Sequence, residues 1–385
     1  MNLLNADVVE HILDSYDHWW PRDFCRLVLI SSIWLQSIRK RLYACPDLTS
    51  YRSCHLLART LQENRDLIPL VRGLDIRPES PSSWRHDEEG KHTRGVCPGV
   101  PRLLALVNLE RLTLSGDLAF SAHYYLRMIA TPQSLKSLSI VCRAPQKPFS
   151  VQKQAFAWDG ELALRFHMLQ TLTLDGLLLD VDDMHYDPEV TLDQDASAAA
   201  RGCTLKELRL SRVDFTDNSG WLCALLGGPG SWRRLRTFTF TTQLCTWRNL
   251  NSFFSVLACA HDSLEHLSFY ARTIDLGAAT EDEFEDMRPL NRLRSLKTSY
   301  HLLLSESFFP IPANVETLEV VGVFKPFHML DWADCIKCNR FPNLQSLIVN
   351  MIESVRLRDV GESQRVFKTL VDACKDHGVE INFVR

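Results

Sequence analysis

One short apolar frame recurs along most of this chain. Its form is apolar-x-x-apolar-x-apolar, and Leu205-Lys206-Glu207-Leu208-Arg209-Leu210 is a clear copy. The successive copies begin at Val71, Leu109, Leu135, Leu169, Leu205, Leu235, Leu264, Leu293, Val315 and Leu344. Such repetition is typical of a solenoid, in which each unit stacks on its neighbours and shares a core with them. Solenoids usually serve as binding surfaces.

The spacing of the copies indicates the kind of repeat. From Leu109 onward the steps are 26, 34, 36, 30, 29, 29, 22 and 29 residues. The later steps lie close to the 20–29 residues of leucine-rich repeats, so the pattern resembles that family, with inserted loops in the early units. The family's Asn or Cys three residues after the last apolar position is replaced here by Asp117, Arg143, Leu177, Val213, Gln243, Arg272, His301, Val323 and Ile352. In the family, a ladder of these side chains satisfies backbone groups inside the turn of each coil. Because this chain lacks the ladder, we expect its coils to be uneven.

We therefore predict an α/β solenoid with parallel strands, one strand for each frame. Apolar residues at helical spacing predict helices near residues 52–64, 121–131, 221–226, 247–260, 327–338 and 362–375. Alternating apolar and polar residues at 379–384 predict a closing strand.

The x positions of the strands should share one face of the sheet, because side chains alternate along a strand. Hydroxyl residues dominate this row, which is also what an exposed sheet face requires for solubility. Its large or charged members are the candidate contacts with a target protein, since such side chains concentrate binding energy. They are Arg111, Glu207, Arg209, His266, Tyr270, Lys297 and Glu319.

Composition narrows the partners and the compartment. The 43 Lys and Arg against 47 Asp and Glu give a net charge of −4, so no basic excess favours nucleic acid or an anionic membrane as partner. The 12 cysteines show no framework spacing, which favours reduced thiols. No signal peptide is recognisable at the N-terminus, and no apolar run is long enough to span a bilayer. We expect a cytoplasmic or nuclear protein.

The spacing of apolar residues within residues 3–43 predicts three short helices. Leu4, Val8, Ile12 and Leu13 share a helical face, and Pro21 suits the first position of a helix. A second stripe follows, and Ser31-Ser32 interrupts it because short hydroxyl side chains favour caps and turns. This second stripe consists of Phe24, Leu27, Val28, Trp34, Leu35, Ile38 and Leu42.

This segment resembles an F-box. The run from Asp23 to Trp34 is similar to the second half of that family's motif, and Leu4, Asp7-Val8-Val9 and Ile12-Leu13 to its first half. The family's Leu-Pro start is Leu4-Asn5 here. The resemblance implies docking on the Skp-type adaptor of a cullin–RING ubiquitin ligase. The implied adaptor-binding residues are Leu4, Val8, Ile12, Leu13, Phe24, Leu27, Val28, Ile30 and Trp34.

We expect three parts in the chain. Residues 1–45 form the F-box-like module, residues 46–102 a linker helix, a weak first repeat and a flexible insertion, and residues 103–385 the irregular repeat array with a C-terminal helix and strand. The insertion, residues 78–101, is rich in Pro, Ser, Gly and charge, which is typical of a surface loop.

Catalytic and metal motifs are not recognisable. His86, His92 and Cys97 lack the paired spacing of zinc ligands, and Cys335-Ile336-Lys337-Cys338 is a CxxC without a second pair. No catalytic signature of the common hydrolase, metalloprotease or kinase types appears. We expect no enzyme activity and no cofactor.

Together these features favour a non-catalytic substrate receptor of an SCF-type ubiquitin ligase, in which the module binds the adaptor, and through it a cullin, while the repeat face binds an unidentified target protein. The alternative is a leucine-rich-repeat interaction scaffold. In that reading, the N-terminal helices only cap the open end of the repeat core.

The frame assigns opposite roles to neighbouring residues, which is testable. Leu208→Asp should unfold the array, because it places an unpaired charge in the core. Changes at Glu207 or Arg209 should leave folding nearly unchanged. Circular dichroism and thermal unfolding of the three variants check the register. A normally folded Leu208→Asp protein would show that the register is wrong.

Overall fold

The computed structural model divides the chain into two compact units, Met1–Lys147 and Pro148–Arg385. It describes residues 5–15, 21–78, 99–105, 109–142, 155–158, 162, 165–181, 204–215, 229–275, 290–299, 314–322, 326–351 and 360–384.

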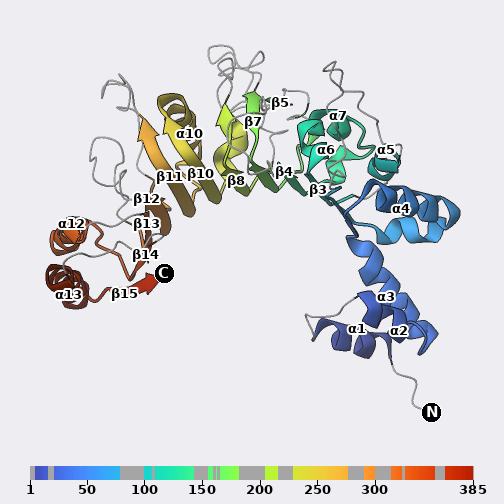
Figure 1. Ribbon diagram of the computed structural model, residues 1–385, viewed down its shortest axis with the longest axis horizontal. Coiled ribbons are helices and arrows are strands. Elements are labelled where there is room, and N and C mark those ends of the chain that lie inside the picture. Colours follow the sequence, from blue (N-terminus) through green and yellow to red (C-terminus); the bar gives the residue numbers. More distant parts are fainter. Residues whose placement is uncertain are drawn as a thin grey trace. The chain divides into compact units, whose positions relative to one another are not determined.

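The first unit joins a helical segment to parallel strands (Figure 1). Its strands are β1 (Asp47–Leu48), β2 (Gly73–Ile76), β3 (Arg111–Ser115) and β4 (Ser137–Val141). Its α-helices are α1 (Ala6–Asp14), α2 (Pro21–Leu27), α3 (Ser32–Ala44), α4 (Tyr51–Glu63), α5 (Gly99–Leu104), α6 (Asp117–Phe120) and α7 (Ala122–Arg127). Two short 3₁₀ helices are η1 (Arg65–Leu70) and η2 (Pro132–Ser134).

The second unit continues the pattern of strand and return. Its main-sheet strands are β6 (Thr171–Asp175), β8 (Glu207–Ser211), β10 (Thr237–Thr246), β11 (His266–Asp275), β12 (Ser295–Ser299), β13 (Thr317–Gly322), β14 (Ser346–Met351) and β15 (Glu380–Val384). Its described helices include η5 (Pro229–Arg234), α10 (Trp247–Ala260), α12 (Pro326–Lys337) and α13 (Val360–Asp376).

Within each unit, the described strands of the main sheet follow the order of the sequence. Each described pairing is parallel, and equivalent positions of the frame stand opposite each other, as Leu208 does with Phe238. The predicted α/β class with parallel strands is confirmed, and this sheet is compatible with a solenoid.

Backbone hydrogen bonds explain the two-residue gap in the frame. The N–H groups of both Lys206 and Glu207 donate to the carbonyl of Gln170, at 2.8 and 3.0 Å. This bulge-like start places two residues where one would otherwise stand, so Leu205 and Leu208 both face the core and are fully buried. The same paired donation occurs at residues 110–111, 136–137, 236–237, 265–266, 294–295, 316–317 and 345–346.

A polar side chain just before the frame links neighbouring coils. The hydroxyls of Ser134, Thr204 and Ser263 donate to the carbonyls of Leu109, Leu169 and Leu235, at 3.1, 3.3 and 2.9 Å. Asn314 similarly donates its amide to the carbonyl of Asn291 at 2.6 Å. These bonds satisfy backbone groups inside the turns, which is the role that an Asn ladder would have at the other end of the strands.

At that other end, three coils turn through left-handed residues. Gly116, Gly176 and Arg212 have φ of 65°, 71° and 53°, each directly after a strand. The turns after β6 and β8 lead into a second parallel sheet, which the sequence did not predict. Its strands are β5 (Ala155–Trp158), β7 (Leu178–Val181) and β9 (Asp214–Phe215). Here Leu177 and Val213, at the expected Asn positions, are buried.

Aromatic packing holds α10 to the sheet of the second unit. Phe240 of β10 stacks on Phe269 of β11 at a centroid distance of 5.7 Å. Phe253 of α10 lies 4.5 Å from Phe269 and 5.4 Å from Phe238. All four rings are buried, so the helix and two strands share one core.

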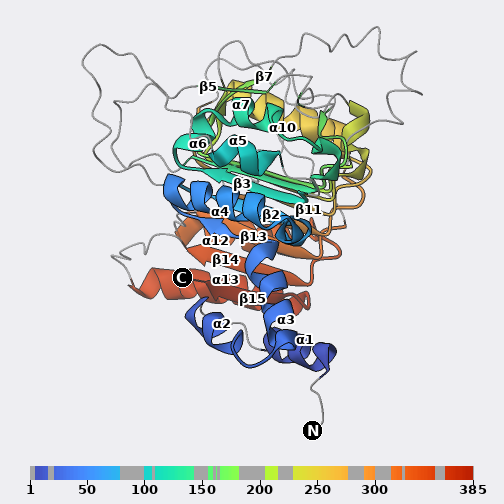
Figure 2. The same cartoon turned by 90° about the vertical axis from the view of Figure 1, so that its right-hand side faces the viewer.

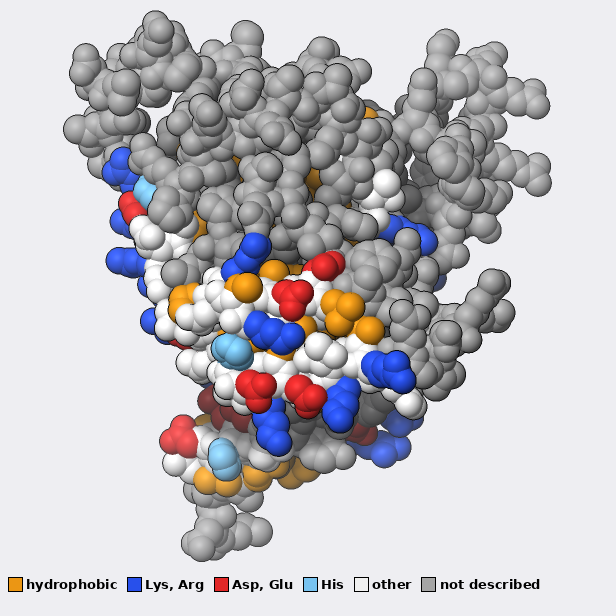
Figure 3. All heavy atoms as spheres, turned by 90° about the vertical axis from the view of Figure 1, so that its left-hand side faces the viewer, with side chains coloured by type: hydrophobic (Ala, Val, Ile, Leu, Met, Phe, Trp, Pro, Cys, Tyr) orange, Lys and Arg blue, Asp and Glu red, His pale blue; other side chains and the backbone are white. Residues whose placement is uncertain are grey.

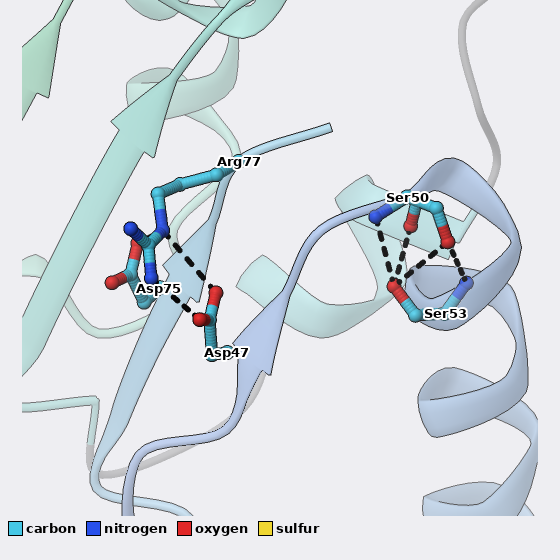
Figure 4. A network of polar contacts seen from close by, with 5 residues as sticks. All are labelled: Asp47, Ser50, Ser53, Asp75 and Arg77. Carbon is cyan, nitrogen blue, oxygen red and sulfur yellow. Dashed lines mark hydrogen bonds and ion pairs between the residues drawn. The ribbon is translucent and has the colours of Figure 1, made fainter. Parts of the chain in front are cut away.

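The start of the first unit's sheet is fixed by local polar contacts (Figure 4). Ser50 and Ser53 form a capping box that begins α4. Arg77 donates two hydrogen bonds to Asp47, at 3.2 and 2.5 Å, and pairs with Asp75 at 3.1 Å. Asp47 stands opposite Asp75 on the adjacent strand, where two negative charges would repel each other. Arg77 pairs with both carboxylates and so offsets this repulsion.

Most predicted elements are confirmed within a few residues. The predicted helices near 52–64, 247–260, 327–338 and 362–375 are α4, α10, α12 and α13. The helix predicted at 221–226 lies outside the described residues, as does most of the predicted loop 78–101. The loop prediction is wrong at its end, because residues 99–101 begin α5. Among the described helices, none is long and apolar enough to cross a membrane.

The aromatic core predicts a large local effect. Phe253→Ala should lower the free energy of unfolding by about 3–5 kcal/mol, because it leaves a cavity among three rings. Phe253→Leu retains most of the volume and should cost less. Denaturant unfolding of both variants measures this, and equal, small losses would show that α10 does not contribute to this core.

Candidate functional site

The first candidate is the three-helix module, in which α1 and α2 pack against α3 (Figure 2). Four side chains close its interior: Val9, Leu13, Trp34 and Ile38. Phe24, Leu27, Val28 and Ile33 pack against this core and stay half-buried. Residues from all three helices therefore contribute to one small core.

Helix α1 carries two apolar stripes side by side. Val9 and Leu13, four residues apart, are fully buried against the other helices. Val8 and Ile12, also four residues apart, remain 48% and 36% exposed. The side chains of the second stripe are therefore not part of the core of the module.

The turn after α2 adds further exposed apolar side chains. Leu29 is 85% exposed and Ile30 is 61% exposed, between the end of α2 and the Ser31 cap of α3. Single exposed apolar residues are common, but several on one small module favour an interaction site.

Ion pairs hold α1 to α3. Lys40 donates a 2.8 Å hydrogen bond to Glu10, and Arg41 pairs with Asp14. The hydrogen bond from Lys40, and then its charge, lower the pKa of Glu10. These surface pairs orient the helices but contribute little stability.

The structure separates the predicted adaptor-binding residues into groups. Val8, Ile12 and Ile30 lie on the surface, and Phe24, Leu27 and Val28 are half-buried. Leu13 and Trp34 pack in the interior, because the module has few other side chains to fill its core, and their role in adaptor contact stays a prediction. Leu4 lies outside the described residues.

Among the described residues of the module, Leu29 is the most exposed apolar one, and the sequence pattern did not single it out as an adaptor contact. Leu29 does not belong to the helical stripe of apolar residues, because it follows the end of α2. The periodicity of the sequence therefore did not identify it. Its position next to Ile30, just before the Ser31-Ser32 break, was the available signal.

The second candidate is the polar face of the sheet in the second unit. Register aligns Glu207, Thr237, His266 and Ser295 in one row across four strands. A parallel row runs through Arg209, Thr239, Ser268, Lys297 and Glu319. The predicted common face for these x positions agrees with this register.

Four of the predicted target-binding residues are already paired with each other. Arg209 contacts Glu207 at 2.5 Å, and Lys297 contacts Glu319 at 2.6 Å. Asn350 also donates to Glu319, at 3.3 Å. Charges neutralised in this way offer hydrogen-bonding capacity more than net charge to a partner.

The other three predicted residues are not gathered into one patch. His266 is exposed and Tyr270 half-buried, about 13 Å apart along the same strand at 3.3 Å per residue. Arg111 belongs to β3 of the first unit, opposite Gly73. The face is therefore a broad polar surface without a focused site.

The cysteines have no arrangement for metal or redox chemistry in the part of the chain that the structure describes. No group of His, Cys, Asp and Glu there could hold a metal ion. Burial raises the pKa of Cys335 in the CxxC segment, which disfavours a reactive thiolate. His86, His92 and Cys97 lie outside the described residues.

Two buried thiols predict a pH dependence of stability. Burial raises the pKa of Cys245 to about 12 and that of Cys374 to about 11. In the unfolded chain these thiols ionise near pH 9, so the stability that they contribute is complete below that pH and is lost as pH rises toward their folded pKa values.

We expect the free energy of unfolding to fall by about 1–2 kcal/mol for each buried thiol between pH 7 and pH 10. Urea unfolding at the two pH values measures this fall. Cys245→Ala should reduce the fall, and Cys338→Ala, at an exposed position, should not. An equal fall in all three proteins would show that Cys245 is not protected in the fold.

Comparison with known proteins does not assign a family. A scan against family models finds no match to the chain, and a search among curated proteins finds no similar sequence.

Proposed function

We propose that this protein is a non-catalytic substrate-receptor subunit of a cullin–RING ubiquitin ligase of the SCF type. The F-box-like helices would dock on a Skp-type adaptor, and the repeat array would hold a target protein. The receptor brings a target lysine close to a ubiquitin-loaded enzyme and so raises its effective concentration. No reaction step is assigned to this chain.

One observation carries the proposal. The module closes its own core with Val9, Leu13, Trp34 and Ile38, yet it leaves Val8, Ile12, Leu29 and Ile30 on its surface. An apolar surface that is not needed for folding favours a partner that buries it. This arrangement supports an adaptor-binding role for the module.

The repeat array supports the second half of the proposal. Its face combines hydroxyls, paired charges and the exposed ring of His266 on a rigid parallel sheet. A rigid surface loses little conformational entropy when a partner binds. Such a face suits a folded protein target better than a small molecule.

The scaffold alternative, with the helices as a cap, has less support. The first strand is already contacted by α4, which also packs on η1, and the buried residues of these two helices include Cys54, Ala58, Leu61 and Leu67. Within the first unit, α1 and α2 pack mainly on α3. A cap would instead bury its apolar side chains against the first strand.

Adaptor binding is the direct test. We expect purified Skp-type adaptor to bind the full chain in a pull-down, and Ile30→Asp to weaken binding at least about tenfold, because it places a charge in an apolar contact. Ile30 is exposed, so this change should leave the fold intact.

Leu56→Asp is the matched control. Leu56 is an apolar residue exposed on α4, outside the module, and its replacement should leave adaptor binding unchanged. Thermal unfolding verifies that both variants fold. Failure of the unaltered chain to bind the adaptor, or equal binding by Ile30→Asp, would contradict the proposal.

A further inference from the structure

Six basic side chains gather at the starts of neighbouring strands in the second unit. We call them the basic rim: Lys206, Arg233, Arg234, Arg236, Arg292 and Arg294. All six are exposed. The chain as a whole carries a net charge of −4, so this local excess is not a consequence of its composition.

The fold brings these residues together from separate segments. Lys206 precedes β8, Arg233 and Arg234 end η5 just before β10, and Arg292 lies just before β12. The strands lie in the order β8-β10-β11-β12 and are parallel, so their starts share one edge of the sheet.

Backbone bonds fix the row at the centre of the rim. The N–H of Arg236 donates to the carbonyl of Lys206, that of Glu265 to Arg236, and that of Arg294 to Glu265, all at 2.9 Å. With about 4.8 Å between adjacent strands, Lys206 and Arg294 stand about 14 Å apart.

Few carboxylates balance the rim. Glu265 lies 3.9 Å from Arg236. Asp262 is three residues before Glu265 in the sequence, and Glu316 follows Arg294 as the next residue of the row. Among the described residues, Lys206, Arg234 and Arg294 have no carboxylate partner. Within the described part of the chain, the rim therefore keeps an excess of positive charge.

We propose that the basic rim binds an acidic segment of a partner protein. A distance of about 14 Å matches four to five residues of extended chain, so a run of Asp and Glu spans the row. Arginine forks suit carboxylates because they donate two parallel hydrogen bonds. The net charge of −4 disfavours a long nucleic-acid backbone more than a short acidic segment, because the longer polyanion meets more of the negative charge elsewhere on the chain.

This inference is independent of the proposed ligase function, because it concerns only charges of the second unit. Its test needs no adaptor. Failure of adaptor binding and failure of the rim are therefore separate results.

The test measures binding of a fluorescein-labelled 12-residue peptide with six Glu residues to the full chain by fluorescence anisotropy. Its neutral counterpart carries Gln in place of Glu. We expect binding of the Glu peptide only, weakened when NaCl is raised, because salt screens exposed charges. Arg234→Glu combined with Arg294→Glu should weaken binding at least about tenfold.

Helix α13 provides the matched control. Arg365→Glu combined with Lys375→Glu makes the same change in net charge at exposed positions. The side of the molecule that carries α12 and α13 in Figure 1 shows charges of both signs mixed with apolar side chains (Figure 3). We expect less than about a twofold change in affinity here, since screened charges at a distance contribute little.

Circular dichroism verifies folding of every variant. If the charge-reversed rim variant does not fold, Arg234→Gln combined with Arg294→Gln provides the same test with a smaller expected loss. The proposal is overturned if the Glu peptide does not bind, if rim and control variants lose affinity equally, or if single-stranded DNA of equal length competes more strongly than the Glu peptide.

Discussion

A carbonyl that accepts two successive N–H groups is the interaction on which the described array depends. It recurs at the start of most strands, as where Gln170 accepts from Lys206 and Glu207. The extra residue allows the apolar side chains on both sides of the gap to enter the core. If the strands began without it, Leu205 and Leu208 would point to opposite faces, because side chains alternate. The two-residue gap in the apolar frame thus follows from this pattern of backbone hydrogen bonds.

The same pattern separates the surfaces of the second unit by chemistry. Residues after the gap, such as Arg209 and Lys297, point from the sheet and pair across or along strands. The first residue of each gap, such as Arg236 or Glu265, lies at the edge, where neighbouring coils align these residues at the spacing of strands. The polar face has largely neutralised charges, and the basic rim does not. A partner that depends on charge would therefore be held at the edge of the sheet, while the face suits contacts by shape and hydrogen bonding.

The helical module follows a different rule. It has about forty residues, too few to bury all of its apolar side chains. Tertiary packing selects Leu13 and Trp34 for the interior and leaves Ile12 and Ile30 outside. An F-box-like pattern in the sequence lists both groups together, so it does not distinguish stability from recognition. Replacement of a residue from the inner group would disturb folding, which is why the adaptor test uses the outer group.

The sequence by itself determined the strands, their register and most helices, because the frame and the helical stripes are local patterns. Leu208 and Phe253 belong to such patterns, and their burial follows from periodicity. Only the tertiary structure decided the second sheet, whose strands are short and depend on left-handed turns at Gly176 and Arg212. It also decided that Lys297 and Glu319 pair across two strands, and that Lys206 and Arg294 share an edge. These outcomes require knowledge of which coils are neighbours, and a local pattern does not contain it.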